Sequence, residues 1–136
     1  MAAQKLFVNL PVGDLKRSMG FFSGLGFRFD TKFTDDKAAC MVVSGEAYVM
    51  LLSAPFFKDF TRREVRSADG PTEAIVALSC ASRGEVDALT DRALASGAAP
   101  AMDPMDHGWM YVRSFYDPDG HHWELFWMGE KAELEG

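Results

Sequence analysis

The chain has 136 residues, of which 48% are hydrophobic and 25% charged, and its formal net charge is −6 at pH 7. This length and composition are typical of a single globular domain with a core of its own. The negative charge argues against nucleic-acid binding, which usually requires a basic patch. No apolar run approaches the roughly 18 residues of a membrane-spanning helix, and the first residues lack the apolar stretch of a signal peptide. We therefore expect a cytoplasmic protein with neither nucleic acid nor membrane as a partner.

The two cysteines, Cys40 and Cys80, each lie within a predicted strand and form no C-x-x-C pair. Free cysteine is among the most buried residue types, and cytoplasmic proteins seldom keep disulfides. We therefore expect two reduced thiols in the core.

The first half of the chain predicts a strand, a helix and three further strands. Residues 5–10 form a short apolar run that ends at Pro11, which is typical of a strand. Asp14 is a candidate N-cap for a helix, and apolar residues then recur at helical spacing as far as the glycines at 24 and 26. Strands are predicted at residues 27–33, 38–43 and 48–53, separated by short polar turns. These elements make up module one, at about residues 4–54.

Residues 55–72 break this pattern and are predicted to form a linker. Phe56, Phe57 and Phe60 indicate a short amphipathic turn, and the residues after them are polar and charged. Exposed aromatic segments usually mark interfaces, so we expect residues 54–60 to contribute to a homodimer contact.

The second half repeats the same order of elements, as module two at about residues 73–128. A strand at 73–80 precedes a helix that Ser82 caps, with Glu85 in the capping-box position. Short strands follow at 99–102 and 109–115. Asp117-Pro118-Asp119-Gly120 then forms a tight turn into a last strand at 122–128, with His121 expected to face solvent. Residues 129–136 form an acidic tail.

The last strand holds a carboxylate, Glu124, among bulky apolar residues. Side chains alternate along a strand, so His122, Glu124 and Phe126 share one face. A carboxylate in such surroundings is paired, protonated or bound to a ligand. The structural alternatives are an ion pair between Glu124 and Arg113, and a hydrogen bond from His122 to Glu124 or to the backbone.

Three stretches of the chain resemble the vicinal oxygen chelate superfamily, which includes glyoxalase I, the bleomycin resistance proteins and the extradiol dioxygenases. They are N-L-P-V-G-D-L-K-R-S-M-G-F-F-S-G-L-G-F, S-R-G-E-V-D-A-L-T-D-R-A-L-A-S-G-A and F-Y-D-P-D-G-H-H-W-E-L. The resemblance implies an α+β fold in which two βαβββ modules form facing curved mixed sheets with outer helices. In the repeat, Phe7 corresponds to Ile75, and residues 48–52 correspond to residues 122–126.

The resemblance also implies where metal-dependent members place their ligands. These positions are occupied here by Phe7, Met50, Ile75 and Glu124, of which only Glu124 has suitable chemistry. A divalent metal needs three or four nitrogen, oxygen or sulfur donors, and Glu124 with His122 supplies two at most. We therefore expect no complete metal site and no cofactor, with Glu124 and His122 as weak metal candidates.

We predict a protein that binds a small, partly apolar molecule in a cleft between the sheets, with Glu124 as the candidate catalytic residue. The alternative is a metal-dependent lyase, isomerase or dioxygenase of the same superfamily with an atypical ligand set. A third alternative is a cleft that has closed into core. The predicted ligand-binding residues are Phe7, Asn9, Met50, Leu52, Ile75, Trp109, Tyr111, Arg113, His122 and Phe126. On the strand at 109–115, the alternative is that the residues alternating with Trp109, Tyr111 and Arg113 face the cleft instead.

Overall fold

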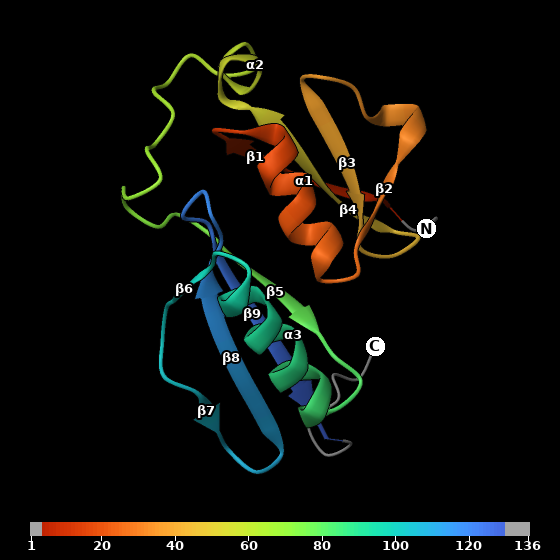
Figure 1. Ribbon diagram of the computed structural model, residues 1–136, viewed down its shortest axis with the longest axis vertical. Coiled ribbons are helices and arrows are strands. Elements are labelled where there is room, and N and C mark those ends of the chain that lie inside the picture. Colours follow the sequence, from red (N-terminus) through yellow and green to blue (C-terminus); the bar gives the residue numbers. More distant parts are fainter. Residues whose placement is uncertain (1–3, 130–136) are drawn as a thin grey trace. The chain divides into compact units, whose positions relative to one another are not determined.

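In the computed structural model of the protein, which describes residues 4–129, the chain divides into two compact units, Met1–Ser67 and Ala68–Gly136 (Figure 1). The boundary between the units lies within the segment predicted to be a linker, and nearly all of the acidic tail lies outside the described residues. Each unit contains one mixed sheet and one main helix, which confirms the predicted α+β class. None of the helices in residues 4–129 has the length and apolar character that crossing a membrane requires.

Unit one contains the elements predicted for module one, together with two short helices. In chain order they are β1 (Leu6–Val12), α1 (Leu15–Gly24), β2 (Arg28–Asp30), the 3-10 helix η1 (Thr31–Phe33), β3 (Ala38–Val42), β4 (Ala47–Ser53) and α2 (Ala54–Lys58). The strand predicted over residues 27–33 is wrong in its second part. The Asp30 side chain accepts a hydrogen bond from the backbone N–H of Lys32 at 2.9 Å, which turns the chain out of the sheet.

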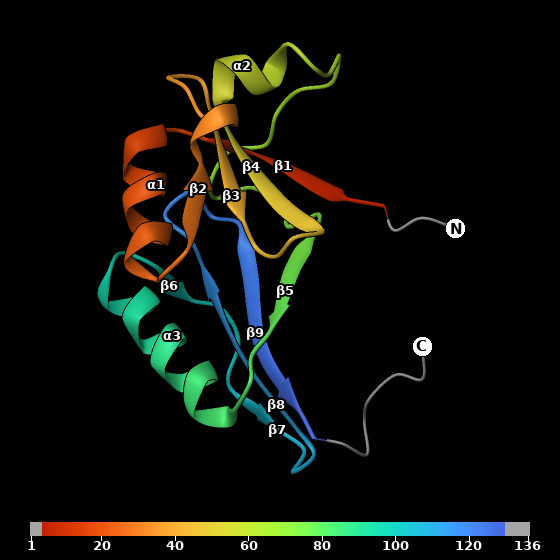
Figure 2. The same ribbon diagram turned by 90° about the vertical axis from the view of Figure 1, so that its right-hand side faces the viewer.

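Helix α1 begins as its sequence predicts. The carboxylate of Asp14 accepts a hydrogen bond from the backbone N–H of Arg17 at 3.1 Å and so caps the first turn. Phe21 and Phe22 are buried on its apolar side, and Gly26 reverses the chain after the helix with φ +99°. Figure 2 shows α1 covering one face of the first sheet.

The first sheet has the strand order β1-β4-β3-β2, in which β1 runs parallel to β4 and the other pairs are antiparallel. Ala39, Met41 and Leu51 share one face and are fully buried, as expected for the face under α1. Phe7, Asn9 and Met50 lie on the opposite face by strand alternation.

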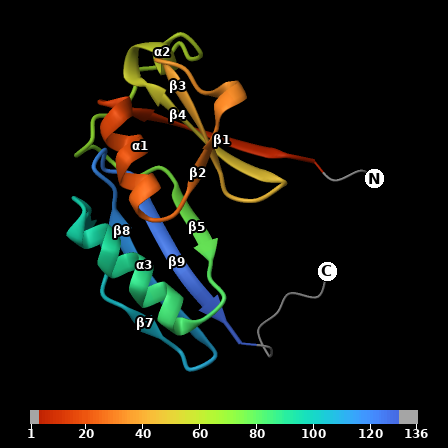
Figure 3. The same cartoon turned by 45° about the vertical axis from the view of Figure 1, so that its right-hand side comes forward.

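Unit two repeats this arrangement. Its elements are β5 (Ile75–Ser79), α3 (Arg83–Ala95), β6 (Ala99–Pro100), β7 (Met105–Asp106), β8 (Met110–Tyr116) and β9 (His122–Met128). Strand order is β5-β9-β8-β6, with β7 pairing to β8, and β5 runs parallel to β9. The Ser82 side chain caps α3 by accepting a hydrogen bond from Glu85 N–H at 3.1 Å. Figure 3 shows α3 lying along β8 and β9. The two-residue strand β7 was not predicted.

The strand registers confirm that the two sheets are structural repeats with equivalent strand pairings. Phe7 stands opposite Tyr48 in the first sheet, as Ile75 stands opposite His122 in the second. The same holds between the antiparallel strands: Cys40 stands opposite Met50, as Ser114 stands opposite Glu124. Equivalent residues of the two modules therefore lie at equivalent points of the two sheets, even where their side chains differ.

The turn between β8 and β9 is built around a buried carboxylate. Oδ1 of Asp117 accepts hydrogen bonds from the backbone N–H groups of Asp119 at 2.9 Å and His121 at 3.0 Å. Its Oδ2 accepts a third from Nε1 of Trp123 at 2.8 Å. Gly120 has φ +79° and packs against the backbone of Ala68. The expectation that His121 faces solvent is wrong, since this turn is packed and leaves His121 only 9% exposed.

Candidate functional site: the open face of module two

The sheet of unit two has one face under α3 and one face without a helix, which we call the open face of module two. Strand alternation and the registers give its members on β5, β8 and β9. They are Ile75, Ala77, Ser79, Met110, Val112, Ser114, Tyr116, His122, Glu124, Phe126 and Met128. The predicted face shared by His122, Glu124 and Phe126 is part of this set.

Glu124 lies half-buried near the middle of the open face. Its neighbours across the strands are Ala77 on β5 and Ser114 on β8, and neither carries a charge. The hydroxyl of Ser114 already accepts a hydrogen bond from Met102 N–H at 2.9 Å. Within residues 4–129, no lysine or arginine pairs with the Glu124 carboxylate. The sheet therefore presents a carboxylate that no lysine or arginine in the described part of the chain neutralises.

His122 lies two residues before Glu124 on the same face and is only 8% exposed. Its Nε2 atom is buried and has no hydrogen-bond partner in the described part of the chain. The ring of Tyr116 meets the imidazole edge-on, with 5.2 Å between ring centroids. The alternative of a hydrogen bond from Nε2 to Glu124 or to the backbone is therefore not what the structure shows.

Arg113 was considered as the partner of Glu124, and this interpretation is wrong. Arg113 stands opposite Leu125 and so faces α3, on the other side of the sheet from Glu124. Its Nη1 atom pairs there with Asp87 at 3.1 Å and with Asp91 at 2.8 Å. The odd-numbered residues of β8 face the helix, and the even-numbered ones face away from it.

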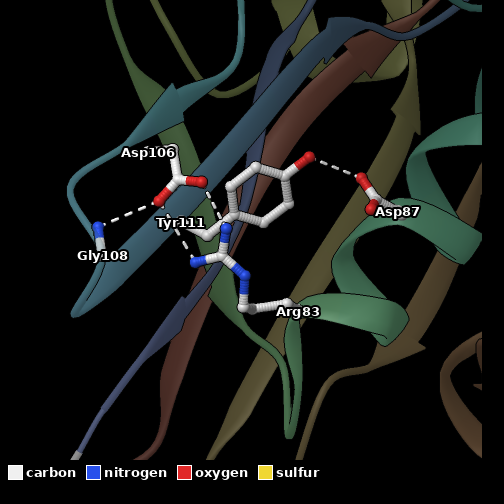
Figure 4. Close-up of polar contacts among 5 residues, drawn as sticks. All are labelled: Arg83, Asp87, Asp106, Gly108 and Tyr111. Carbon is white, nitrogen blue, oxygen red and sulfur yellow. Dashed lines mark hydrogen bonds and ion pairs between the residues drawn. The ribbon is translucent and has the colours of Figure 1, made fainter.

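The same alternation removes Tyr111 from the predicted ligand-binding face. The Tyr111 hydroxyl donates a hydrogen bond to Oδ1 of Asp87 at 2.6 Å, and this bond lowers the pKa of the Asp87 carboxyl (Figure 4). The guanidinium of Arg83 lies over the Tyr111 ring, 4.6 Å from its centroid, and is paired with Asp106. These contacts fasten α3 and the β7 segment to the sheet.

Trp109 belongs to neither face of β8, because it lies just before the strand begins. Its side chain is 49% exposed, and its ring stacks against His107 with 6.1 Å between centroids. A role for Trp109 in ligand binding stays a prediction.

The corresponding face of unit one is aromatic rather than acidic. Phe7 is 48% exposed and stacks on Tyr48 with 4.8 Å between ring centroids. Asn9 is exposed, and its Nδ2 donates to the carbonyl of Phe7 at 3.3 Å. Met50 is half-buried and Leu52 is buried. Tyr48 was missed as a member of this face, although it lies two residues before Met50 on one strand.

The superfamily's metal chemistry does not fit these residues. The register places Phe7, Met50 and Ile75 at positions corresponding to those the resemblance assigns to ligands, and none of them supplies a nitrogen or oxygen donor. Among residues 4–129, no three histidine, cysteine, aspartate or glutamate side chains gather as a metal site would require. Glu124 and His122 remain two donors at most, so we derive no chemistry through a metal.

The chain matches the family model of the Glyoxalase/Bleomycin resistance protein/Dioxygenase superfamily over residues 6–125. This match covers most of the chain and agrees with the two repeated modules, so the protein belongs to this superfamily. No curated protein matches the chain.

Solved structures with the same fold come from several bacteria. Hypothetical protein SA1046 from S. aureus is 27% identical, with a TM-score of 0.77, over 93% of this chain and 94% of that one. A glyoxalase-related enzyme from Fulvimarina pelagi is 21% identical, with a TM-score of 0.78, over 93% of this chain and 88% of that one. The fosfomycin resistance protein FosX from Listeria monocytogenes is 21% identical, with a TM-score of 0.71, over 98% of this chain and 100% of that one. At these identities the last two show the fold alone.

Proposed function

We propose that the protein binds a small, partly apolar molecule on the open face of module two, with Glu124 as the polar group that holds it. The observation that carries this proposal is the half-buried Glu124 carboxylate, with which no lysine or arginine of residues 4–129 pairs. Keeping a carboxylate among apolar neighbours costs free energy unless a partner compensates it. A bound molecule supplies that partner. The sequence-based expectation of a cleft between the two sheets stays a prediction, as does the cytoplasmic location.

The chemistry of Glu124 defines which molecules suit the site. An ionised carboxylate only accepts hydrogen bonds, so the ligand contributes an amine or another donor. The chain's net charge of −6 adds a long-range field that disfavours anions. Ile75 and Phe126 give the face its apolar surface. A cationic or neutral molecule with an apolar body therefore fits better than an acid.

A ligand screen by calorimetric titration tests this proposal. We expect basic aromatic compounds to bind, and Glu124→Gln to abolish this binding while leaving the free energy of unfolding unaltered. Glu46→Gln, which removes an exposed carboxylate from unit one, is the matched control and should bind as the wild type does. If Glu124→Gln instead lowers stability by about 1–3 kcal/mol and leaves binding unchanged, Glu124 is structural.

The second candidate is a metal-dependent lyase, isomerase or dioxygenase with an atypical ligand set. The observation in its favour is that His122 and Glu124 share one face, two residues apart on β9. Metal analysis of protein purified without a metal-affinity tag distinguishes the candidates. Stoichiometric Zn, Ni, Fe or Mn that is lost in the variant combining Glu124→Gln with His122→Ala would establish this function instead.

We also propose that the protein is a homodimer. Phe60, just after helix α2, is 69% exposed, and its ring packs edge-on against the half-buried Phe56. Exposed aromatic clusters usually mark interfaces. Light scattering at micromolar concentration should give twice the chain mass. A mass near 15.0 kDa contradicts the proposal.

A further inference from the structure

The buried imidazole of His122 carries an unexplained feature. Among residues 4–129 its Nε2 atom has no hydrogen-bond partner, although the side chain is only 8% exposed. A buried nitrogen that leaves water without gaining a partner costs about 1–3 kcal/mol. Native proteins leave few such atoms unpaired, and those that remain call for an explanation such as a catalytic role or a bound water or ion. His122 shares a face with Glu124, which favours a molecule bound at this face. Because Nε2 has almost no exposed surface, such a molecule reaches it only when the side chains over it move.

We propose that Nε2 of His122 is a second polar contact for the ligand of the open face, and that this ligand carries a hydroxyl group. The inference rests on the proposed function of the face and adds the second group that the ligand must have. Neutral imidazole presents Nε2 as a donor in one tautomer and as an acceptor in the other. A hydroxyl both donates and accepts, so it pairs with Nε2 in either tautomer.

The geometry of β9 sets the spacing of the two contacts. His122 and Glu124 are two residues apart on one face, which separates their Cα atoms by roughly 7 Å along the strand. On β5, Ile75 lies beside His122 and Ala77 lies beside Glu124, so the surface next to both polar groups is apolar. A molecule with a hydroxyl at one end, an amine at the other and an aromatic ring between them matches this pattern.

Tyr116 positions the imidazole. It stands opposite His122 on β8, and their rings meet at an interplanar angle of 71°. This contact restricts rotation of the imidazole, so Nε2 stays oriented without a hydrogen bond of its own. Aromatic pairs in this arrangement contribute beyond the area they bury.

Two matched probes test the inference by calorimetric titration. Tyramine has an aromatic ring, an amine and a phenol hydroxyl, whereas 2-phenylethylamine has the ring and the amine alone. We expect the wild type to bind tyramine roughly tenfold more tightly, the value of one hydrogen bond to a buried polar atom. His122→Phe should remove this preference while still binding 2-phenylethylamine. Glu124→Gln should abolish the binding of both probes, and His107→Phe, which changes an exposed histidine, should alter neither.

A second measurement needs no variant. The ¹⁵N chemical shift of Nε2 in the wild-type imidazole should change on addition of tyramine and stay constant with 2-phenylethylamine. Equal affinities for the two probes, or a tyramine preference that survives in His122→Phe, overturn the inference and leave the proposed function standing. If neither probe binds at millimolar concentration, the inference is overturned and the proposed function fails for amines as well.

Discussion

The hydroxyl of Tyr111 on β8 donates a hydrogen bond to Oδ1 of Asp87 on α3 across 2.6 Å. The same carboxylate oxygen accepts from Nη1 of Arg113 at 3.1 Å. Oδ1 of Asp87 on α3 therefore binds two residues of β8, Tyr111 and Arg113. The Tyr111 bond is the main cause that lowers the pKa of the Asp87 carboxyl, and Arg113 adds to it against the cost of desolvation.

The first prediction concerns Tyr111→Phe, which removes that bond. Because the pKa of Asp87 is lowered in the folded state, its ionisation stabilises the protein above the ordinary carboxyl pKa. This contribution is lost as the pH falls through the folded value. The side chain of Asp87 is 49% exposed, so we expect the substitution to cost only about 1 kcal/mol at neutral pH. Urea unfolding should show a smaller cost at about pH 3. An equal cost at both pH values contradicts this account.

The second prediction compares two glycines. A Cβ atom on Gly120 would lie 1.7 Å from the carbonyl oxygen of Ala68, and the backbone there has φ +79°. Gly120→Ala should therefore lower the free energy of unfolding by more than about 3 kcal/mol. Gly20 lies inside α1 with nothing within 4 Å of a Cβ, so Gly20→Ala should raise stability by about 1 kcal/mol. Thermal unfolding of both variants measures the contrast, and a mild effect at Gly120 would show that the turn can move away from Ala68.

The fold was largely predictable, because its signals are local. The caps at Asp14 and Ser82 fix where both helices begin, and the D-P-D-G turn fixes the last hairpin. The end of β2 was not predictable from apolar residues alone, since a side-chain bond from Asp30 competes with strand pairing there.

The site was predicted only in part, for a physical reason. Alternation along β9 is a property of one strand, so the face shared by His122 and Glu124 follows from the sequence. Which residues of β8 join that face depends on the register between β8 and β9, and a shift of one residue exchanges the faces. The sequence left open whether Tyr111 and Arg113 or the residues alternating with them join that face, and the register puts Tyr111 and Arg113 on the other side. That Nε2 of His122 finds no partner among residues 4–129 depends on packing in three dimensions and leaves no sequence signal.

The third prediction concerns Thr90 on α3. Its hydroxyl oxygen is fully buried and has no hydrogen-bond partner in the described chain. Thr90→Val replaces the hydroxyl with a methyl group of similar size, so it should raise the free energy of unfolding by about 1 kcal/mol. The reverse change at its fully buried helical neighbour, Val86→Thr, should lower stability by a similar amount or more. A loss of stability in Thr90→Val would mean that the hydroxyl bonds to a backbone carbonyl.

The fourth prediction concerns Asp117→Asn. The carboxylate uses both oxygens as acceptors, and Oδ2 faces the Nε1–H of Trp123. An amide has one oxygen, so its NH₂ group would oppose a donor, either the indole or the backbone. We expect a loss of about 1–3 kcal/mol, measured by denaturant unfolding followed through tryptophan fluorescence. Asp103→Asn, at an exposed loop position, should be neutral.

Every strand pair of the two sheets joins partners from the same half of the chain. The parallel partner of β1 is β4, which ends at Ser53. During synthesis, all strands of the first sheet therefore leave the ribosome before β9, the last strand of the second sheet, has been translated. Domains generally fold in this order, amino-terminal unit first. Because the first sheet needs no strand from the carboxyl-terminal half, its hydrogen bonds can form while that half is still being synthesised.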